Sequence, residues 1–130
     1  MTRHICTLLL FGFASAAQAQ SPPFTYPQTI GTSSVSILPD NPARKKLIFH
    51  NPNDTAKIAV CPVGPNRLGG SSSAPIVAVI NGAGCITILP YDTLVIDNGA
   101  AAANPPMSNR SAWVGIASAG GSALTIWEWE

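Results

Sequence analysis

Charge and long apolar runs are both scarce in this chain of 130 residues, in which charged side chains make up 10%. Lysine and arginine number 7 against 6 for aspartate and glutamate, so the formal net charge is +1 with neutral histidines. A chain with so little excess charge has no electrostatic attraction for nucleic acid or for an anionic membrane surface. The composition therefore argues against both of these partner classes.

Histidine and cysteine are few, with 2 and 3 residues, and His4 and Cys6 lie in the first ten positions. The rest of the chain holds His50, Cys61 and Cys85. Their spacing is not that of a zinc motif, and one histidine beside two cysteines gives too few ligands for such a site. We therefore expect no metal and no other cofactor.

The N-terminus has the three parts of a secretory signal peptide. Arg3 supplies a positive charge, residues 5–14 form a short apolar run, and Ala17-Gln18-Ala19 has the small residues of a cleavage site. About 20 apolar residues are needed to span a bilayer, which makes an uncleaved anchor the less favoured alternative. We expect cleavage of residues 1–19 and a secreted or periplasmic protein without a membrane span. Loss of Arg3 also makes the numbers of basic and acidic side chains equal.

Cys61 and Cys85 are the only cysteines of the expected mature chain. An oxidising compartment favours a disulfide between them. The alternative is two unpaired buried thiols, because only the geometry of the strands can bring the side chains within bonding distance.

The chain has no convincing amphipathic helix and instead contains eight short β-favouring runs separated by Gly, Pro and Asn turns. The expected strands are 32–38, 47–49, 58–60, 76–80, 85–89, 93–96, 112–117 and 123–129. This pattern predicts an all-β fold, an antiparallel β-sandwich of jelly-roll or immunoglobulin-like type. Residues 20–34 are interpreted as a Pro-rich lead-in and residues 35–130 as a single β-sandwich domain.

Two of the connections have the composition of hairpin turns. Asn51-Pro52-Asn53-Asp54 follows the expected strand 47–49, and its residues supply the backbone angles of a chain reversal. A Gly-rich run at 118–122 joins the last two expected strands. We expect each connection to join two neighbouring strands of the same sheet.

His50 is the one candidate for a catalytic base in the expected mature chain. Asp54 follows four residues later, and Ser71-Ser72-Ser73 offers hydroxyl groups for a nucleophile. No Gly-x-Ser-x-Gly elbow surrounds these serines. A histidine next to a turn is more often a surface residue, so we expect no catalytic residues and no enzyme activity. A small secreted hydrolase that uses His50 remains an alternative.

The other polar motifs have simpler interpretations. Glu128 and Glu130 share one face of the last expected strand and are explained as solvated terminal charges. The triplets 53–55 and 109–111 match the N-glycosylation sequon, which matters only in a host that glycosylates exported chains.

The C-terminal strand provides the candidate binding residues. Alternation puts Leu124 and Ile126 on one face and Trp127 and Trp129 on the other. If the aliphatic face enters the core, both rings point outward, and neighbouring exposed tryptophans usually mark a protein partner or a sugar ring. The alternative is a twisted or bulged strand with both rings between the sheets. We expect Trp127 and Trp129 to bind an unidentified protein or carbohydrate, whereas Trp113 is expected in the core.

The middle of the chain resembles small β-sandwich modules of phage virion surfaces and of phage-derived or exported bacterial proteins. In that pattern a basic residue opens a strand, alternating apolar residues enter the core, and an asparagine ends the strand before a polar turn. The matching residues are Arg44-x-x-Leu47-x-Phe49-x-Asn51, then Asp54, then Ile58-x-Val60. The resemblance implies a structural or adhesive module without catalysis, and a virion or phage-like surface component is one form of it. The expected signal peptide and disulfide depart from the virion examples.

The signal-peptide prediction has a direct test. Because the small residues Ala17 and Ala19 follow the apolar run with the spacing that signal peptidase recognises, we expect cleavage after Ala19. N-terminal sequencing of the exported protein should begin at Gln20. A sequence that begins at Met1 contradicts the prediction.

Overall fold

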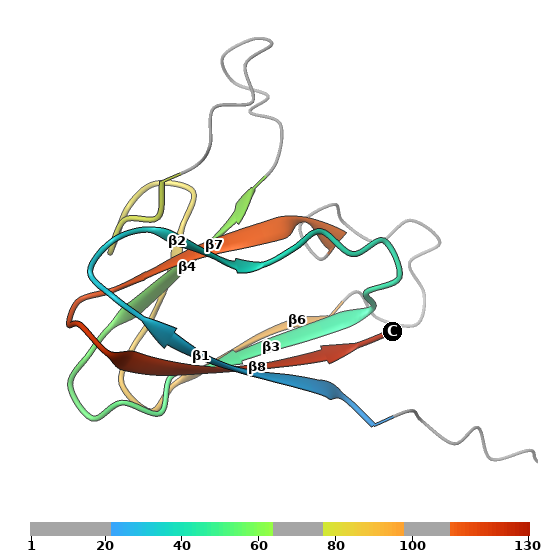
Figure 1. Ribbon diagram of the computed structural model, residues 1–130, viewed down its shortest axis with the longest axis horizontal. Coiled ribbons are helices and arrows are strands. Elements are labelled where there is room, and N and C mark those ends of the chain that lie inside the picture. The colour runs from blue at the N-terminus through green and yellow to red at the C-terminus, as the bar shows by residue number, and fades with distance from the viewer. Residues whose placement is uncertain (1–21, 64–76, 98–109) are drawn as a thin grey trace, which may run out of the picture.

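The computed structural model describes residues 22–63, 77–97 and 110–130. The expected signal peptide and the serine run 71–73 lie outside the described residues. The described chain forms eight strands: β1 (Phe24–Ile30), β2 (Val35–Leu38), β3 (Lys46–His50), β4 (Ile58–Val63), β5 (Ile86–Ile88), β6 (Thr93–Asp97), β7 (Ala112–Ala117) and β8 (Ser122–Trp129). They make two four-stranded antiparallel sheets, sheet A in the order β1-β8-β3-β6 and sheet B in the order β2-β7-β4-β5 (Figure 1). The predicted all-β sandwich is confirmed.

The strand order identifies the type of sandwich. Each strand of the first half pairs with one of the second half: β1 with β8, β2 with β7, β3 with β6 and β4 with β5. Nested antiparallel pairing of eight strands in two sheets is the jelly-roll arrangement, whereas immunoglobulin domains divide their strands differently. The structure therefore favours the first of the two predicted types.

Both predicted hairpins are wrong. The turn at residues 51–54 leads from β3 in sheet A to β4 in sheet B, and the Gly-rich run leads from β7 in sheet B to β8 in sheet A. Turn residues reverse the direction of the chain in both places, but they do not select the sheet that receives the next strand. That choice depends on long-range pairing, which the local sequence does not contain.

Two strand assignments also need correction. β1 lies inside residues 20–34, which were interpreted as a lead-in, so the sandwich begins earlier than residue 35. Pro27 is compatible with this strand because β1 is at the edge of sheet A, where a missing N–H is tolerated. The described part of the expected strand 76–80, residues 77–80, is not a strand. No helix within the described ranges is long and apolar enough to cross a membrane.

Period-two alternation along the strands builds the core between the sheets. On β3 the side chain of Phe49 is fully buried and His50 points to the other face, as the sequence predicts. Trp113 of β7 is 1% exposed and packs against Phe49 with ring centroids 5.1 Å apart. The core cluster consists of Ile30, Ile37, Leu38, Leu47, Phe49, Ile58, Val60, Ile88, Trp113, Ala117, Leu124 and Ile126.

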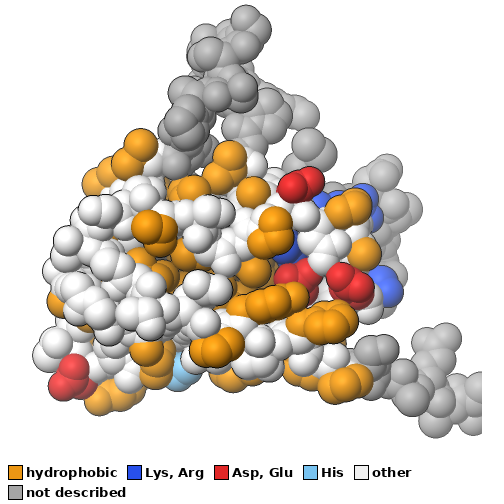
Figure 2. All heavy atoms as spheres, in the orientation of Figure 1, with side chains coloured by type: hydrophobic (Ala, Val, Ile, Leu, Met, Phe, Trp, Pro, Cys, Tyr) orange, Lys and Arg blue, Asp and Glu red, His pale blue; other side chains and the backbone are white. Residues whose placement is uncertain are grey.

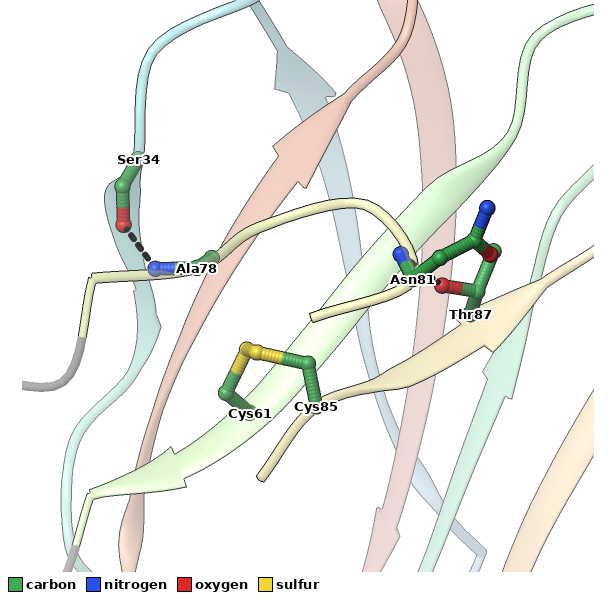
Figure 3. Close-up of a disulfide and its surroundings, with 6 residues drawn as sticks. All are labelled: Ser34, Cys61, Ala78, Asn81, Cys85 and Thr87. Atoms are coloured by element: carbon green, nitrogen blue, oxygen red, sulfur yellow. Dashed lines mark hydrogen bonds between the residues drawn. A yellow bond between two sulfur atoms is a disulfide. The ribbon is translucent and has the colours of Figure 1, made fainter. Parts of the chain in front are cut away.

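The predicted disulfide between Cys61 and Cys85 is present, with an S–S distance of 2.03 Å (Figure 3). Cys61 lies on β4 and Cys85 comes directly before β5, beside the ladder pair of Val60 and Ile86. The bond therefore links the two strands at the point where their pairing begins.

The chain before Cys85 covers the outer face of sheet B (Figure 3). Ala78 is buried, and its N–H donates to Ser34 Oγ at 2.8 Å, next to β2. The N–H of Asn81 donates to Thr87 Oγ1 at 2.9 Å, on β5. The segment thus crosses the sheet from its β2 edge to its β5 edge.

A buried ion pair lies at the end of the sandwich where β3 begins and β8 ends. Arg44 and Glu128 are only 1% and 2% exposed, and Arg44 Nε lies 3.3 Å from Glu128 Oε1. The guanidinium also donates to the carbonyl oxygens of Ser111 at 2.9 Å and Pro39 at 3.0 Å. The charge of the buried carboxylate is therefore compensated, and the guanidinium is bound from several sides.

The interpretation of Glu128 as a solvated charge is wrong, because the alternation of β8 turns it inward. The side-chain amide of Asn41 donates to Oε1 of Glu128 and, at 2.8 Å, to Oε1 of Glu130. The two carboxylates are neighbours, as their spacing suggests, but only Glu130 is exposed to solvent.

The disulfide should contribute substantially to stability. Cys85→Ala should lower the free energy of unfolding by about 2–5 kcal/mol, the usual cost of losing a native disulfide from a small exported domain. Urea denaturation of the variant and the wild type measures the difference. Alkylation of the unreduced wild type should label neither cysteine, and two labelled thiols contradict the pairing.

The buried ion pair gives a second stability prediction. Glu128→Ala leaves the Arg44 guanidinium buried without its carboxylate, so it should cost about 3–5 kcal/mol of unfolding free energy. Glu130→Ala is the matched control, because it removes an exposed carboxylate two residues away and should change stability by no more than about 0.5 kcal/mol. Equal losses in the two variants, measured by urea denaturation, contradict the prediction.

Candidate functional site

The outer face of sheet A carries both tryptophans that the sequence singles out. Along β8, Leu124, Ile126 and Glu128 are buried, while Trp127 and Trp129 between and after them are partly exposed. The alternation is regular, so neither ring lies between the sheets. In Figure 1 only the turns at the left end of the molecule reach below sheet A, and no described segment crosses its outer face, in contrast to the outer face of sheet B.

The antiparallel register aligns most of the outward side chains in three rows across the strands. The middle row is Thr25, Trp127, Ile48 and Val95. One flanking row is Trp129, Lys46 and Asp97, and the other is Pro27, Thr125, His50 and Thr93. We call the surface formed by these three rows the Trp127 face.

Trp129 is held in place by a chain of contacts across three strands. Lys46 Nζ of β3 lies over the Trp129 ring, 5.4 Å from its centroid, a cation–π contact. The same Nζ is 3.6 Å from Asp97 Oδ2 of β6. Because Lys46 is the register partner of both residues, one side chain joins ring and carboxylate along the row.

Trp127 is held by a second chain of the same kind. Its ring stacks on the imidazole of His50 with centroids 6.1 Å apart and planes inclined by 25°. His50 Nδ1 in turn lies 3.0 Å from Thr93 Oγ1 on β6. Each tryptophan of β8 is therefore supported by a nitrogen-bearing side chain of β3, which is itself bonded to a polar side chain of β6.

The centre of the Trp127 face is apolar and its border is polar. Ile48 and Val95 continue the middle row beside Trp127, and Val95 is 51% exposed. Lys46 and Asp97 compensate each other at one end. Figure 2 shows sheet A along the lower edge of the molecule, with apolar side chains on both sides of the histidine. An apolar centre with a polar border is the usual layout of a binding surface.

The described contacts of His50 do not include Asp54. Its ring contacts Thr93 and Trp127, whereas Asp54 is exposed in the following turn and is approached by the hydroxyl of Thr55 at 3.4 Å. The serines proposed as nucleophiles lie outside the described residues. Within the described ranges no group of three His, Cys, Asp or Glu side chains is placed to hold a metal ion.

The turn after β3 contains a polar network that the sequence analysis missed. The buried amide nitrogen of Asn51 donates to the carbonyl oxygens of Ala56 at 2.8 Å and Ile88 at 3.1 Å. Asn51 Oδ1 accepts from Asn53 Nδ2 at 2.6 Å, and Asn53 Nδ2 also donates to Ala123 O at 2.7 Å. The turn is thereby tied to β5 and β8. The sequon nitrogen of Asn53 donates both of these bonds, so a glycan there would replace one of its two N–H donors and break at least one bond.

Comparison with known proteins adds no assignment to these observations. No protein-family model matches the chain, and neither the curated proteins nor the solved structures contain a significant match. The case for a function therefore depends on the geometry of the chain itself.

Proposed function

We propose that this chain is an exported, non-catalytic β-sandwich module that acts by binding or assembly at the cell surface or in the periplasm, through the Trp127 face. The observation that carries the proposal is the pair of outward tryptophans on β8, each supported across the sheet by β3 and β6. Aromatic side chains kept outward at the expense of burial are typical of contact surfaces.

The contrast between the two sheets supports this assignment. The outer face of sheet B is covered by residues 77–85, whereas sheet A keeps an apolar row directed to solvent. The cross-strand supports reduce the number of orientations open to each ring. Preorganisation of this kind lowers the entropy lost on binding.

Export is the part of the proposal that rests on the N-terminal sequence. The disulfide supports it, because such bonds persist mainly in oxidising compartments. Assembly into a virion or phage-like surface structure is the alternative that the resemblance implies. Self-association of the purified protein through the same face distinguishes that alternative from binding to another molecule.

Removal of the Trp127 ring should weaken binding. We expect the labelled mature protein to bind the isolated envelope of the producing cells, and Trp127→Ala to reduce the affinity by about 30-fold, as for a central aromatic contact. Tyr91→Ala is the matched control, because Tyr91 is a more exposed aromatic residue, 68% exposed, outside this face. Sedimentation of the labelled protein with the envelope measures the affinity.

Two results contradict the proposal. One is the absence of binding by the wild type, both to the envelope and to itself. The other is an equal affinity of Trp127→Ala and the wild type. Circular dichroism spectra of the variant and the wild type show whether the variant is folded. Val95→Arg provides a second test, because it places a charge in the middle row without removing a packed ring.

A further inference from the structure

The charges of the Trp127 face are balanced within the face. The Lys46 ammonium and the Asp97 carboxylate of this face lie 3.6 Å apart. The remaining members of the three rows are threonines, apolar or aromatic residues, Pro27 and His50. A ligand with a strong net charge of either sign would find no uncompensated opposite charge here. The surface therefore suits an uncharged ligand.

The apolar area of the face is small for a protein partner. A stable protein contact takes about 800 Å² from each partner and has a large apolar centre. Val95 is the only large apolar residue of this face with more than a third of its surface exposed. Lys46 partly covers the Trp129 ring, and His50 partly covers the Trp127 ring. A narrow ligand that lies on a strip of the sheet fits this area better.

Hydrogen-bonding groups surround the aromatic strip. Threonine hydroxyls at 25 and 125 lie in the middle and flanking rows, each able to donate and to accept, and Thr93 Oγ1 has bonding capacity left beside its bond to His50. The Lys46 ammonium and the Asp97 carboxylate add a donor and an acceptor at the other end. A sugar ring has the matching chemistry, because it combines an apolar C–H face with a border of hydroxyls.

From these features we infer that the Trp127 face binds a neutral carbohydrate chain, an inference that rests on the proposed function. The rings of Trp127 and Trp129 are two residues apart on one strand, so their Cα atoms are roughly 7 Å apart along β8. Adjoining sugars of one chain stack on the two rings. Their hydroxyls bond to the threonines and to the Lys46–Asp97 pair.

The test uses the envelope preparation after periodate oxidation, which cleaves sugar diols, together with defined probes. The neutral probes are cellohexaose, mannohexaose and hexa-N-acetylchitohexaose, and the acidic probe is polygalacturonate. We expect periodate to abolish binding, or a neutral hexaose to compete for it. We also expect the affinity to change by less than about twofold between low and high salt, because no net charge is involved.

Direct titration of the competing hexaose should show the same residue dependence. Trp127→Ala and Val95→Arg should each weaken its binding by about 30-fold, whereas Tyr91→Ala should leave it unchanged. An equal affinity of all three variants contradicts the carbohydrate inference.

Failure of this inference differs from failure of the proposed function. Binding that depends on Trp127 but survives periodate, without competition by any neutral hexaose, identifies a non-carbohydrate partner and overturns only the inference. Binding that falls strongly with salt, or that only polygalacturonate inhibits, contradicts the inference that the carbohydrate is neutral. Envelope binding that does not depend on Trp127 overturns the proposed function itself.

Discussion

The buried ion pair between Arg44 and Glu128 is the constraint on which the candidate site depends. A carboxylate enters a protein interior only when a cation and hydrogen-bond donors accompany it. Because Glu128 is held inside, Trp127 and Trp129 on either side of it must point outward. A slip of β8 by one residue would put both rings into the core and Leu124, Ile126 and Glu128 into water. The pair therefore acts on the site through the register of the strand.

The strands and the core were predictable because they depend on local alternation. Seven of the expected runs correspond to observed strands, and the inward direction of Phe49, Leu124 and Ile126 follows from period two. The assignment of strands to sheets was not predictable in this way. In a jelly roll the pairing strands are far apart in the chain, and the turns near Asn53 and Gly120 look alike whether the chain stays in its sheet or crosses to the other.

The same limit applies to the candidate site. Sequence alternation places Trp127 and Trp129 on one face, and the structure puts them there, although their role in binding is a proposal. The supports from Lys46 and His50 were beyond sequence reasoning, because they come from β3, a strand some eighty residues earlier that becomes the neighbour of β8 only through the register. Asn51 was likewise seen as a turn former, whereas its buried amide bonds to strands that follow much later.

Strand β1 shows how a local rule fails at an edge. Pro27 argued against a strand, but a proline removes only one N–H, and an edge strand has one side without a partner strand. Proline at such an edge also hinders pairing with another chain. The feature that concealed β1 in the sequence therefore suits its place in the fold.

The two outer faces of the sandwich differ in how far other segments cover them. Residues 77–85 cross the outer face of sheet B, and Ala78 of this segment is buried there. The disulfide joins the end of the segment to β4. Over sheet A no described segment plays that part, so Ile48, Val95 and the tryptophan rings keep some contact with water. A small domain tolerates such uncovered apolar side chains when the opposite face and the core supply its stability. The burial on the sheet B side therefore offsets the cost of leaving apolar side chains of the Trp127 face in contact with water.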